Sequence, residues 1–103
     1  RTIVFSQYRN TAVRICKELN GIQGIRAKVF LGQAMKDGHG LTQKEQQEII
    51  NEFSLGKTNI LVATSIGEEG LDLPEVNLVV FTYFSLTRGH YIFTVDFFRP
   101  GEQ

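Results

Sequence analysis

The sequence predicts an α/β domain in which helices cover both faces of a mainly parallel β-sheet. Its expected strands are continuous apolar runs, which is the pattern of strands that are buried on both faces. Two segments with helical periodicity lie between them. The resulting order of strand, helix, strand, helix, strand and strand is typical of a three-layer α/β/α architecture.

The first part of the chain provides a strand, a helix and a second strand. The run Ile3–Phe5 is β-branched and aromatic. After it, apolar side chains recur at helical spacing as far as Gly21, a residue suited to ending a helix; they are Ala12, Ile15, Cys16 and Leu19. The second strand is expected at Ala27–Leu31, and Gly32–Leu41 is expected to form a loop.

The second helix is marked by a capping box at Thr42–Glu45, in which a Thr hydroxyl and a Glu carboxylate each accept a hydrogen bond from the other residue's backbone amide. Two further strands are expected at Asn59–Ala63 and Asn77–Phe81. The aromatic segment Tyr91–Phe98 is expected to be a strand or one arm of a hairpin, packed on the sheet or on a partner. The second helix is expected to end near Gly56 and to bury the apolar Ile49, Ile50 and Phe53, with Gln46 completing the same stripe.

Composition is that of an ordinary globular domain. With 103 residues, 42% of them hydrophobic, the chain is expected to form one domain with a modest core. No apolar run approaches the roughly 18–20 residues that span a bilayer, so no membrane partner is expected. The single Cys16 fits a reducing, intracellular compartment. The start lacks an initiator Met and a signal-peptide pattern, as expected of a piece of a longer protein.

A formal net charge of zero conceals an uneven distribution of charge. Residues 1–44 contain eight Lys and Arg against two acidic residues, a formal charge of +6, and residues 45–103 carry −6. The basic half is suited to binding phosphate groups, and Lys36 and Lys44 are candidates on charge alone. A solvated surface on which the two signs happen to separate explains the composition equally well.

The segment Ala63–Pro74 follows the third expected strand, at the edge of a parallel sheet where ligands bind. Gly67 and Gly70 allow its backbone amides to approach a phosphate closely. The Thr64 hydroxyl is a further donor, and Asp72 is an acceptor suited to sugar hydroxyls. Taken by itself, the pattern is more often that of a turn with solvated acidic residues. No His or Cys supports a metal site there.

The longer string ATSIGEEGLDLPEVNLVVF resembles motif V of superfamily-2 helicases and the strand that follows it. Ile3–Arg9 resembles motif IV, and Phe30–Gln47 resembles the F-x-G-Q segment, glycine-rich loop and T/S-Q-x-E-Q helix start of the same family. The three matches occur in the family's order. The resemblance is closest to the archaeal Hef and FANCM-type DNA helicases, with the RIG-I-like and Dicer helicases more distant. It implies a RecA-like, P-loop NTPase-type fold and the second of two motor domains.

The resemblance also implies a division of roles among the matched residues. Gly70 and Asp72 would face ATP, with Asp72 near the ribose, while Glu68 and Glu69 would support the geometry of the loop. No catalytic or metal-binding residue is assigned. Nucleic-acid phosphates would be bound at strand ends and helix starts by Ser6, Gln7, Arg9, Thr42, Gln43 and Thr64.

Two features of that family are missing from this sequence. It has no G-x-x-x-x-G-K-[ST] motif and no DEAH-type box, which belong to the first motor domain, so ATP and Mg²⁺ are expected to be held mainly by that domain of a full-length protein. Residues 82–103 form an atypical tail without the Q-R-x-G-R-x-G-R of motif VI, and its Arg88 and Arg99 lie at the wrong spacing. Residues 1–103 are therefore expected to be a partial domain, truncated or altered at the C-terminus.

The leading hypothesis is part of an ATP-dependent DNA helicase or translocase that acts on forked or branched DNA, with no ATPase activity in this chain alone. Its expected partners are single-stranded or branched DNA and the first RecA-like domain of the same polypeptide. One alternative is a non-catalytic module that binds nucleic acid or a protein, and another is an RNA helicase of the same superfamily. An unrelated nucleotide-binding α/β domain is disfavoured because no G-x-G-x-x-G follows a strand.

Overall fold

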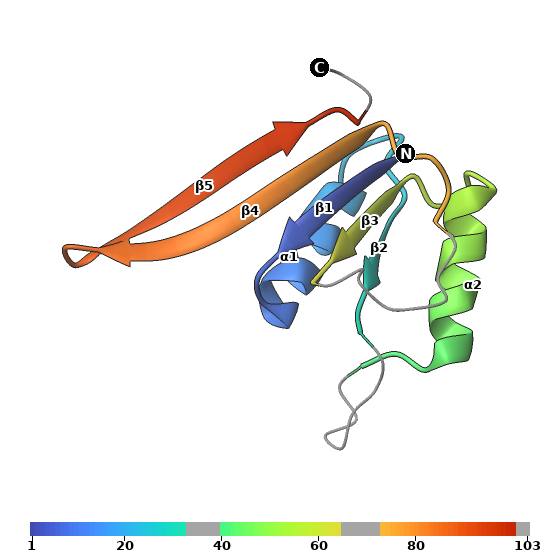
Figure 1. Ribbon diagram of the computed structural model, residues 1–103, viewed down its shortest axis with the longest axis horizontal. Coiled ribbons are helices and arrows are strands. Elements are labelled where there is room, and N and C mark those ends of the chain that lie inside the picture. The colour runs from blue at the N-terminus through green and yellow to red at the C-terminus, as the bar shows by residue number, and fades with distance from the viewer. Residues whose placement is uncertain (33–39, 65–72, 101–103) are drawn as a thin grey trace.

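The computed structural model of the chain describes residues 1–32, 40–64 and 73–100. They form a five-stranded sheet and two helices, and the expected order of elements is confirmed (Figure 1). The elements are β1 (Thr2–Ser6), α1 (Arg9–Asn20), β2 (Ala27–Phe30), α2 (Gln43–Ser54), β3 (Ile60–Ala63), β4 (Leu78–Thr87) and β5 (His90–Phe98). Neither helix is both long and apolar enough to cross a membrane.

The sheet has the strand order β2-β3-β1-β4-β5, so the first strand of the chain lies at its centre. β1 pairs in parallel with both of its neighbours, and Thr2 is level with Ile60 on one side and Leu78 on the other. β2 is also parallel to β3. Only β5 runs antiparallel, along β4. The expected mainly parallel sheet is confirmed.

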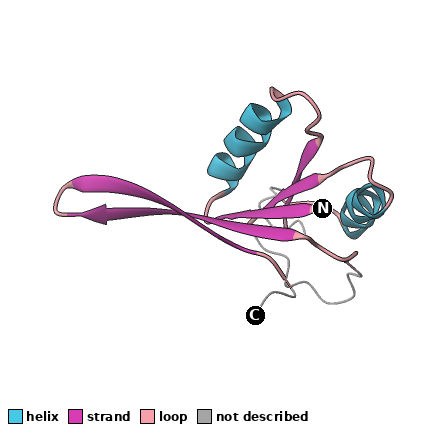
Figure 2. Ribbon diagram, turned by 90° about the horizontal axis from the view of Figure 1, so that it is seen from above, coloured by secondary structure: helices cyan, strands magenta, loops and turns pink. Residues whose placement is uncertain are grey.

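Alternate residues of the central strands build two cores, one on each face of the sheet. Ile3 and Leu61 pack with Ile50 and Phe53 of α2. Their neighbours along the strands face the other way: Val4 and Val62 pack with residues of α1. Figure 2 shows the two helices on either side of the sheet. Continuous apolar strands were the signal for this three-layer arrangement, and burial on both faces is the physical reason for it.

The helix α2 is positioned by its expected cap and by one buried amide. The Thr42 hydroxyl accepts a hydrogen bond from the Glu45 amide at 3.1 Å, and the Thr42 amide donates to Glu45 Oε1 at 2.9 Å, as the capping box predicts. Gln46 is completely buried, and its Nε2 donates to the Leu31 carbonyl at 2.8 Å. This bond ties the first turn of α2 to the chain just after β2.

Two arginines lie at the edge of the sheet where its parallel strands begin. The Arg1 guanidinium donates to the carbonyls of Phe53 and Ser54 at the end of α2. Arg26 does the same for the Gly56 and Lys57 carbonyls at 2.9 Å each. The Arg1 cation thereby favours the negative end of the α2 dipole, whereas Arg26 holds the loop that follows α2.

The tail forms a β-hairpin that was only partly expected. β4 does not end at Phe81 but continues to Thr87, and it pairs with β5 through a two-residue turn, Arg88-Gly89. The φ angles of the two turn residues are 53° and 80°, the combination that a type I′ turn requires. The outer part of this hairpin projects past both helices (Figures 1 and 2). The expectation of a strand or hairpin arm is confirmed, but the aromatic side chains of its outer part remain exposed rather than packed on the sheet.

Candidate nucleic-acid interface

Three parallel strands end level with one another and create a common edge. Phe5 of β1 is in register with Ala63 of β3, which is in register with Phe30 of β2. Both helices begin at this edge, because each follows a strand that ends there (Figure 1). The six residues to which the resemblance assigned nucleic-acid phosphates therefore lie on this side of the sheet: Ser6, Gln7, Arg9, Thr42, Gln43 and Thr64. We call this side the carboxyl edge.

The turn between β1 and α1 presents a cationic helix start. Arg9 is the first residue of α1 and is exposed. Tyr8, at the N-cap, makes no side-chain capping bond, and the first turn has no acidic residue. The positive end of the helix dipole is thus left without an anionic side chain of its own, which suits it to an incoming phosphate. Ser6 differs: it is buried, and its hydroxyl donates to the Tyr8 carbonyl at 3.4 Å.

Gln7 has a structural role that sequence reasoning missed. Its Oε1 accepts a hydrogen bond from the Phe84 amide at 2.9 Å. Main-chain pairing between β1 and β4 stops at Ser6 and Thr82, so this side chain continues the ladder one step beyond the strand. Gln7 anchors the base of the hairpin at the carboxyl edge. No local pattern indicates such a contact, because its partner is 77 residues away in sequence.

The start of α2 places a hydroxyl at the edge, but it also brings a carboxylate. Thr42 and Gln43 are both exposed. The Thr42 oxygen accepts the capping bond, which leaves its hydroxyl proton to be donated elsewhere. Hydrogen bonds from Thr42 lower the pKa of the Glu45 carboxyl, first the one from its backbone amide. That carboxylate remains charged near neutral pH and partly offsets the attraction of this helix start for an anion.

Hydroxyl groups line the central strands at the same edge. Thr64 follows the last residue of β3 and is half-buried, beside the end of β1 at Ser6. On the other side of Ser6 lies Thr82, whose Oγ1 donates to the Phe5 carbonyl at 2.8 Å. Thr82 is buried and braces the strands. Thr64, with no such bond in the described structure, is the more available donor.

Only part of the basic half of the sequence is free to serve this edge. Arg1 and Arg26 are engaged in capping carbonyls at the opposite edge. Lys28 forms an ion pair with Glu52 at 2.6 Å. Of the basic residues described, Arg9 and Lys44 lie in the first turns of α1 and α2. As far as the described residues show, the carboxyl edge is therefore mildly rather than strongly cationic.

The residues expected to face ATP, Gly70 and Asp72, lie outside the described residues, as do Glu68, Glu69 and Lys36. In the parts of the chain that are described, no three His, Cys, Asp or Glu side chains gather in a way that could hold a metal ion.

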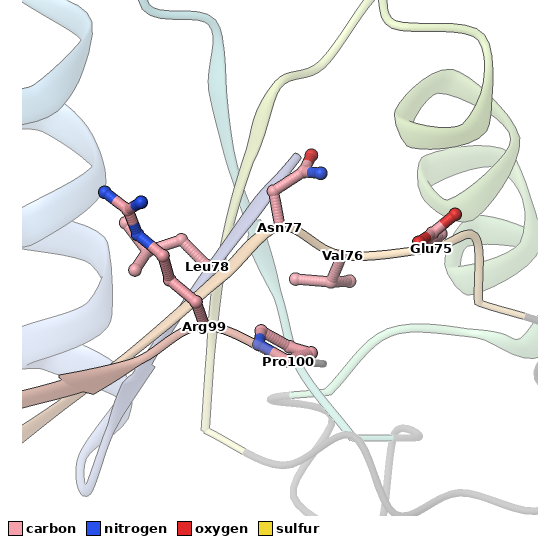
Figure 3. A pocket seen from close by; sticks show the side chains of 6 residues that line it. All are labelled: Glu75, Val76, Asn77, Leu78, Arg99 and Pro100. Atoms are coloured by element: carbon pink, nitrogen blue, oxygen red, sulfur yellow. The ribbon is translucent and has the colours of Figure 1, made fainter. Parts of the chain in front are cut away.

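A hollow of about 380 Å³ lies at the opposite edge of the sheet. Figure 3 shows the Glu75 carboxylate and the Arg99 guanidinium pointing away from each other there. None of its lining residues belongs to the expected phosphate-binding set. Because parallel sheets bind ligands at the carboxyl ends of their strands, we assign the site to the carboxyl edge and not to this hollow. The hollow is lined by Glu75, Val76, Asn77, Leu78, Arg99 and Pro100.

Comparison with known proteins identifies the family of this chain. Residues 1–96 match the family described as helicase conserved C-terminal domain. The chain is 53% identical over 81 residues to the ATP-dependent DNA helicase mph1 of Neurospora crassa, covering 78% of this chain and 7% of that protein. It is 45% identical over 83 residues to the DEAD-box ATP-dependent DNA helicase Fancm of Drosophila melanogaster, covering 78% and 6%.

A solved structure agrees with these relatives. The helicase domain of Hef from Pyrococcus furiosus is 56% identical, with a TM-score of 0.61, over 79% of this chain and 15% of that one. The chain thus spans less than a sixth of the length of each of these proteins.

Proposed function

This chain belongs to the helicase conserved C-terminal domain family, and on that basis we propose that it is part of the second motor domain of an ATP-dependent DNA helicase or translocase. Its relatives include the ATP-dependent DNA helicases mph1 and Fancm and the helicase domain of Hef. In the whole protein it would contribute phosphate contacts to one strand of forked or branched DNA, inside the cell. It would also form one face of the ATP cleft.

One observation carries the proposal: residues from three separate segments of the chain converge on the carboxyl edge. Arg9 comes from the start of α1, Thr42 from the start of α2 and Thr64 from the end of β3. A cation, a helix start and hydroxyl groups at one edge are groups that bind phosphates without reading bases. Such contacts hold a strand of any sequence, as translocation requires.

The six expected residues divide into two kinds in this proposal. Arg9, Thr42, Gln43 and Thr64 are exposed or half-buried and are proposed to touch phosphates directly. Ser6 and Gln7 are proposed to position the edge, since their polar groups bond to Tyr8 and Phe84 of the same chain.

ATP and Mg²⁺ belong to the full-length protein in this proposal. The first motor domain would hold the phosphates and the metal ion, and Gly70 and Asp72 of this chain would face the nucleotide from across the cleft. ATP turnover, when both domains are present, supplies the energy that moves one domain relative to the other. The isolated chain is expected to hydrolyse no ATP, and measurable turnover by the pure chain would overturn this assignment.

The experiment is a titration of a fluorescent single-stranded oligonucleotide at several salt concentrations, using Arg9→Gln and, as its matched control, Lys17→Gln. Both residues are exposed cations on α1, but Lys17 lies in its last turn, away from the carboxyl edge. Arg9→Gln is expected to weaken binding about three- to tenfold and to reduce the slope of log K against log salt by about one. Lys17→Gln is expected to leave both unchanged. Equal effects of the two variants would exclude a localised site.

A second candidate function is a non-catalytic module that binds nucleic acid, and the tail without motif VI favours it. Adding the first motor domain of a related helicase distinguishes the two. A catalytic role predicts that ATP changes the affinity for the strand, whereas a binding module shows salt-dependent binding that ATP does not alter. Matched DNA and RNA oligonucleotides in the same titration decide between a DNA and an RNA helicase.

A further inference from the structure

The β4–β5 hairpin has one face that is almost wholly apolar. Strand alternation places Val80 on the side of α1, where it packs against the core beneath that helix. Phe84 and Phe93 lie on the same side, because they line a groove with residues of α1. We define the hairpin face as the six large apolar side chains on this side that remain exposed: Phe84, Leu86, Tyr91, Phe93, Val95 and Phe97.

The opposite side of the hairpin has a different character. It presents Tyr83 and Ile92 among polar side chains, namely Ser85, Thr87, His90, Thr94 and Asp96. Asp96 is the only Asp, Glu, Lys or Arg in the two strands, and it points away from the hairpin face. The hairpin is therefore amphipathic, with one side suited to water and the other suited to burial.

The hairpin face is large for a surface that stays in water. Its six side chains are between 45% and 79% exposed. Since a large apolar side chain offers on the order of 200 Å², about 700 Å² of apolar surface remains uncovered. Monomeric proteins rarely expose apolar patches larger than a few hundred Å², and larger ones mark interaction sites.

We propose that the hairpin face is a homodimer interface, in which two copies of this chain pack their hairpins face to face about a two-fold axis. Burial of this face on both copies removes roughly 1,400 Å² in total, within the ~1,200–2,000 Å² of a stable interface. The face carries no charge, so a self-complementary contact brings no like charges together. The projection of the hairpin past the helices leaves room for a second one (Figure 2).

The groove beside α1 gives the second copy a place to fit. It has a volume of about 290 Å³ and runs between the hairpin face and α1. Phe84 and Phe93 line it from the hairpin, and α1 contributes Thr11, Arg14, Ile15, Glu18 and Leu19. Side chains near the partner's turn, such as Leu86 and Tyr91, are of the size and polarity to enter it. Pairing of the two β5 edges instead would leave both hairpin faces exposed.

The test measures the mass of the 103-residue chain in solution by sedimentation equilibrium and compares two variants. Tyr91→Glu places a charge on the hairpin face, and Thr94→Glu places the same charge on the opposite side of the same strand. The wild-type chain is expected to approach twice its 11.7 kDa as its concentration rises from about 5 to about 500 μM. Tyr91→Glu is expected to raise the dissociation constant at least about 30-fold, and Thr94→Glu to change it less than about threefold.

Circular dichroism confirms that both variants fold as the wild type does before their masses are compared. A wild-type chain that remains monomeric over this range overturns the proposal and leaves the face to a different partner. Equal weakening by the two variants overturns it, as does open-ended growth beyond the dimer, which would indicate pairing of β5 edges. None of these outcomes depends on nucleic-acid binding, so the interface and the proposed helicase role fail or succeed separately.

Discussion

Thr42 supports folding and the proposed phosphate site with different parts of one hydroxyl group. Its oxygen accepts the amide of Glu45, and its proton is available to a phosphate. Thr42→Ala is expected to lower the free energy of unfolding by about 1 kcal/mol and to weaken strand binding. Thr42→Asp is expected to keep the cap, and with it the stability, while its charge repels phosphate. Urea unfolding and oligonucleotide titration separate the two effects, and an Asp variant that binds normally would remove Thr42 from the site.

Glu52 is expected to make stability depend on pH in acid. The Lys28 ammonium is the main cause that lowers the pKa of this carboxyl below its ordinary 4.5, and the Thr58 hydroxyl adds a hydrogen bond. A lowered pKa in the folded state stabilises the fold above the unfolded pKa, and this contribution disappears as the pH falls through the folded pKa. The difference in urea midpoint between the wild type and Glu52→Gln is therefore expected at pH 7 and should shrink as the pH falls below 4.5. A pH-independent difference would contradict the ion-pair explanation.

At this scale, sequence reasoning succeeds where a side chain's partner is local. The capping box at Thr42–Glu45 spans three residues and was predicted with its atoms. The roles of Arg1 and Gln7 were out of reach, because their partners lie more than 50 residues away. Gln46 is intermediate: helical spacing placed it on the buried stripe, but not its bond to Leu31.

The hairpin is the element that sequence patterns indicated least completely. Tyr91–Phe98 was predicted as a strand or hairpin arm, and β5 covers it. The continuation of β4 from Phe81 to Thr87 was missed, because Arg-Gly is a weaker turn signal than Asn-Gly or Asp-Gly. Pairing with β5 then extends β4 beyond the point where β1 can support it.

Substitutions in the turn test its geometry. Arg88 has a positive φ that few residues other than glycine and asparagine adopt readily, so Arg88→Asn is expected to raise the free energy of unfolding by about 0.5–1 kcal/mol. Gly89→Ala meets no atom within 4 Å but has a φ of 80°, and it is expected to lower that free energy by about 1 kcal/mol. Changes of opposite sign in the free energy of unfolding, measured in urea, would support a type I′ turn. A Gly89→Ala variant with an unchanged free energy of unfolding would contradict it.

At the scale of the whole molecule, β3 joins the two cores. Leu61 and Val62 are adjacent and completely buried, yet each belongs to a different core. Leu61→Ala is expected to lower the free energy of unfolding by about 3 kcal/mol, whereas Leu55→Ala, at a residue that is 72% exposed, should change it by less than about 0.5 kcal/mol. Denaturant unfolding of the two variants provides the comparison. Similar losses of unfolding free energy in the two variants would contradict the burial of Leu61 in the core.

The layered architecture and the carboxyl edge followed from the sequence for a general reason. Continuous apolar strands require cover on both faces, and parallel strands bring their following loops to one edge, whatever their exact contacts. The direction taken by the tail could not be predicted from the sequence, because the same aromatic residues suit a strand, a hairpin arm or a partner surface. Which of these aromatic residues are covered depends on where β4 stops pairing with β1.

The central position of β1 has a consequence for synthesis. Among the strands of this sheet it leaves the ribosome first, and its partners on both sides, β3 and β4, are translated about 55 to 75 residues later. Until Thr82 has emerged, at least one edge of this apolar strand has no main-chain partner, and such an edge invites pairing with other chains. Of the five strands described, the one at the middle of the finished sheet is thus the one that waits longest for both of its partners.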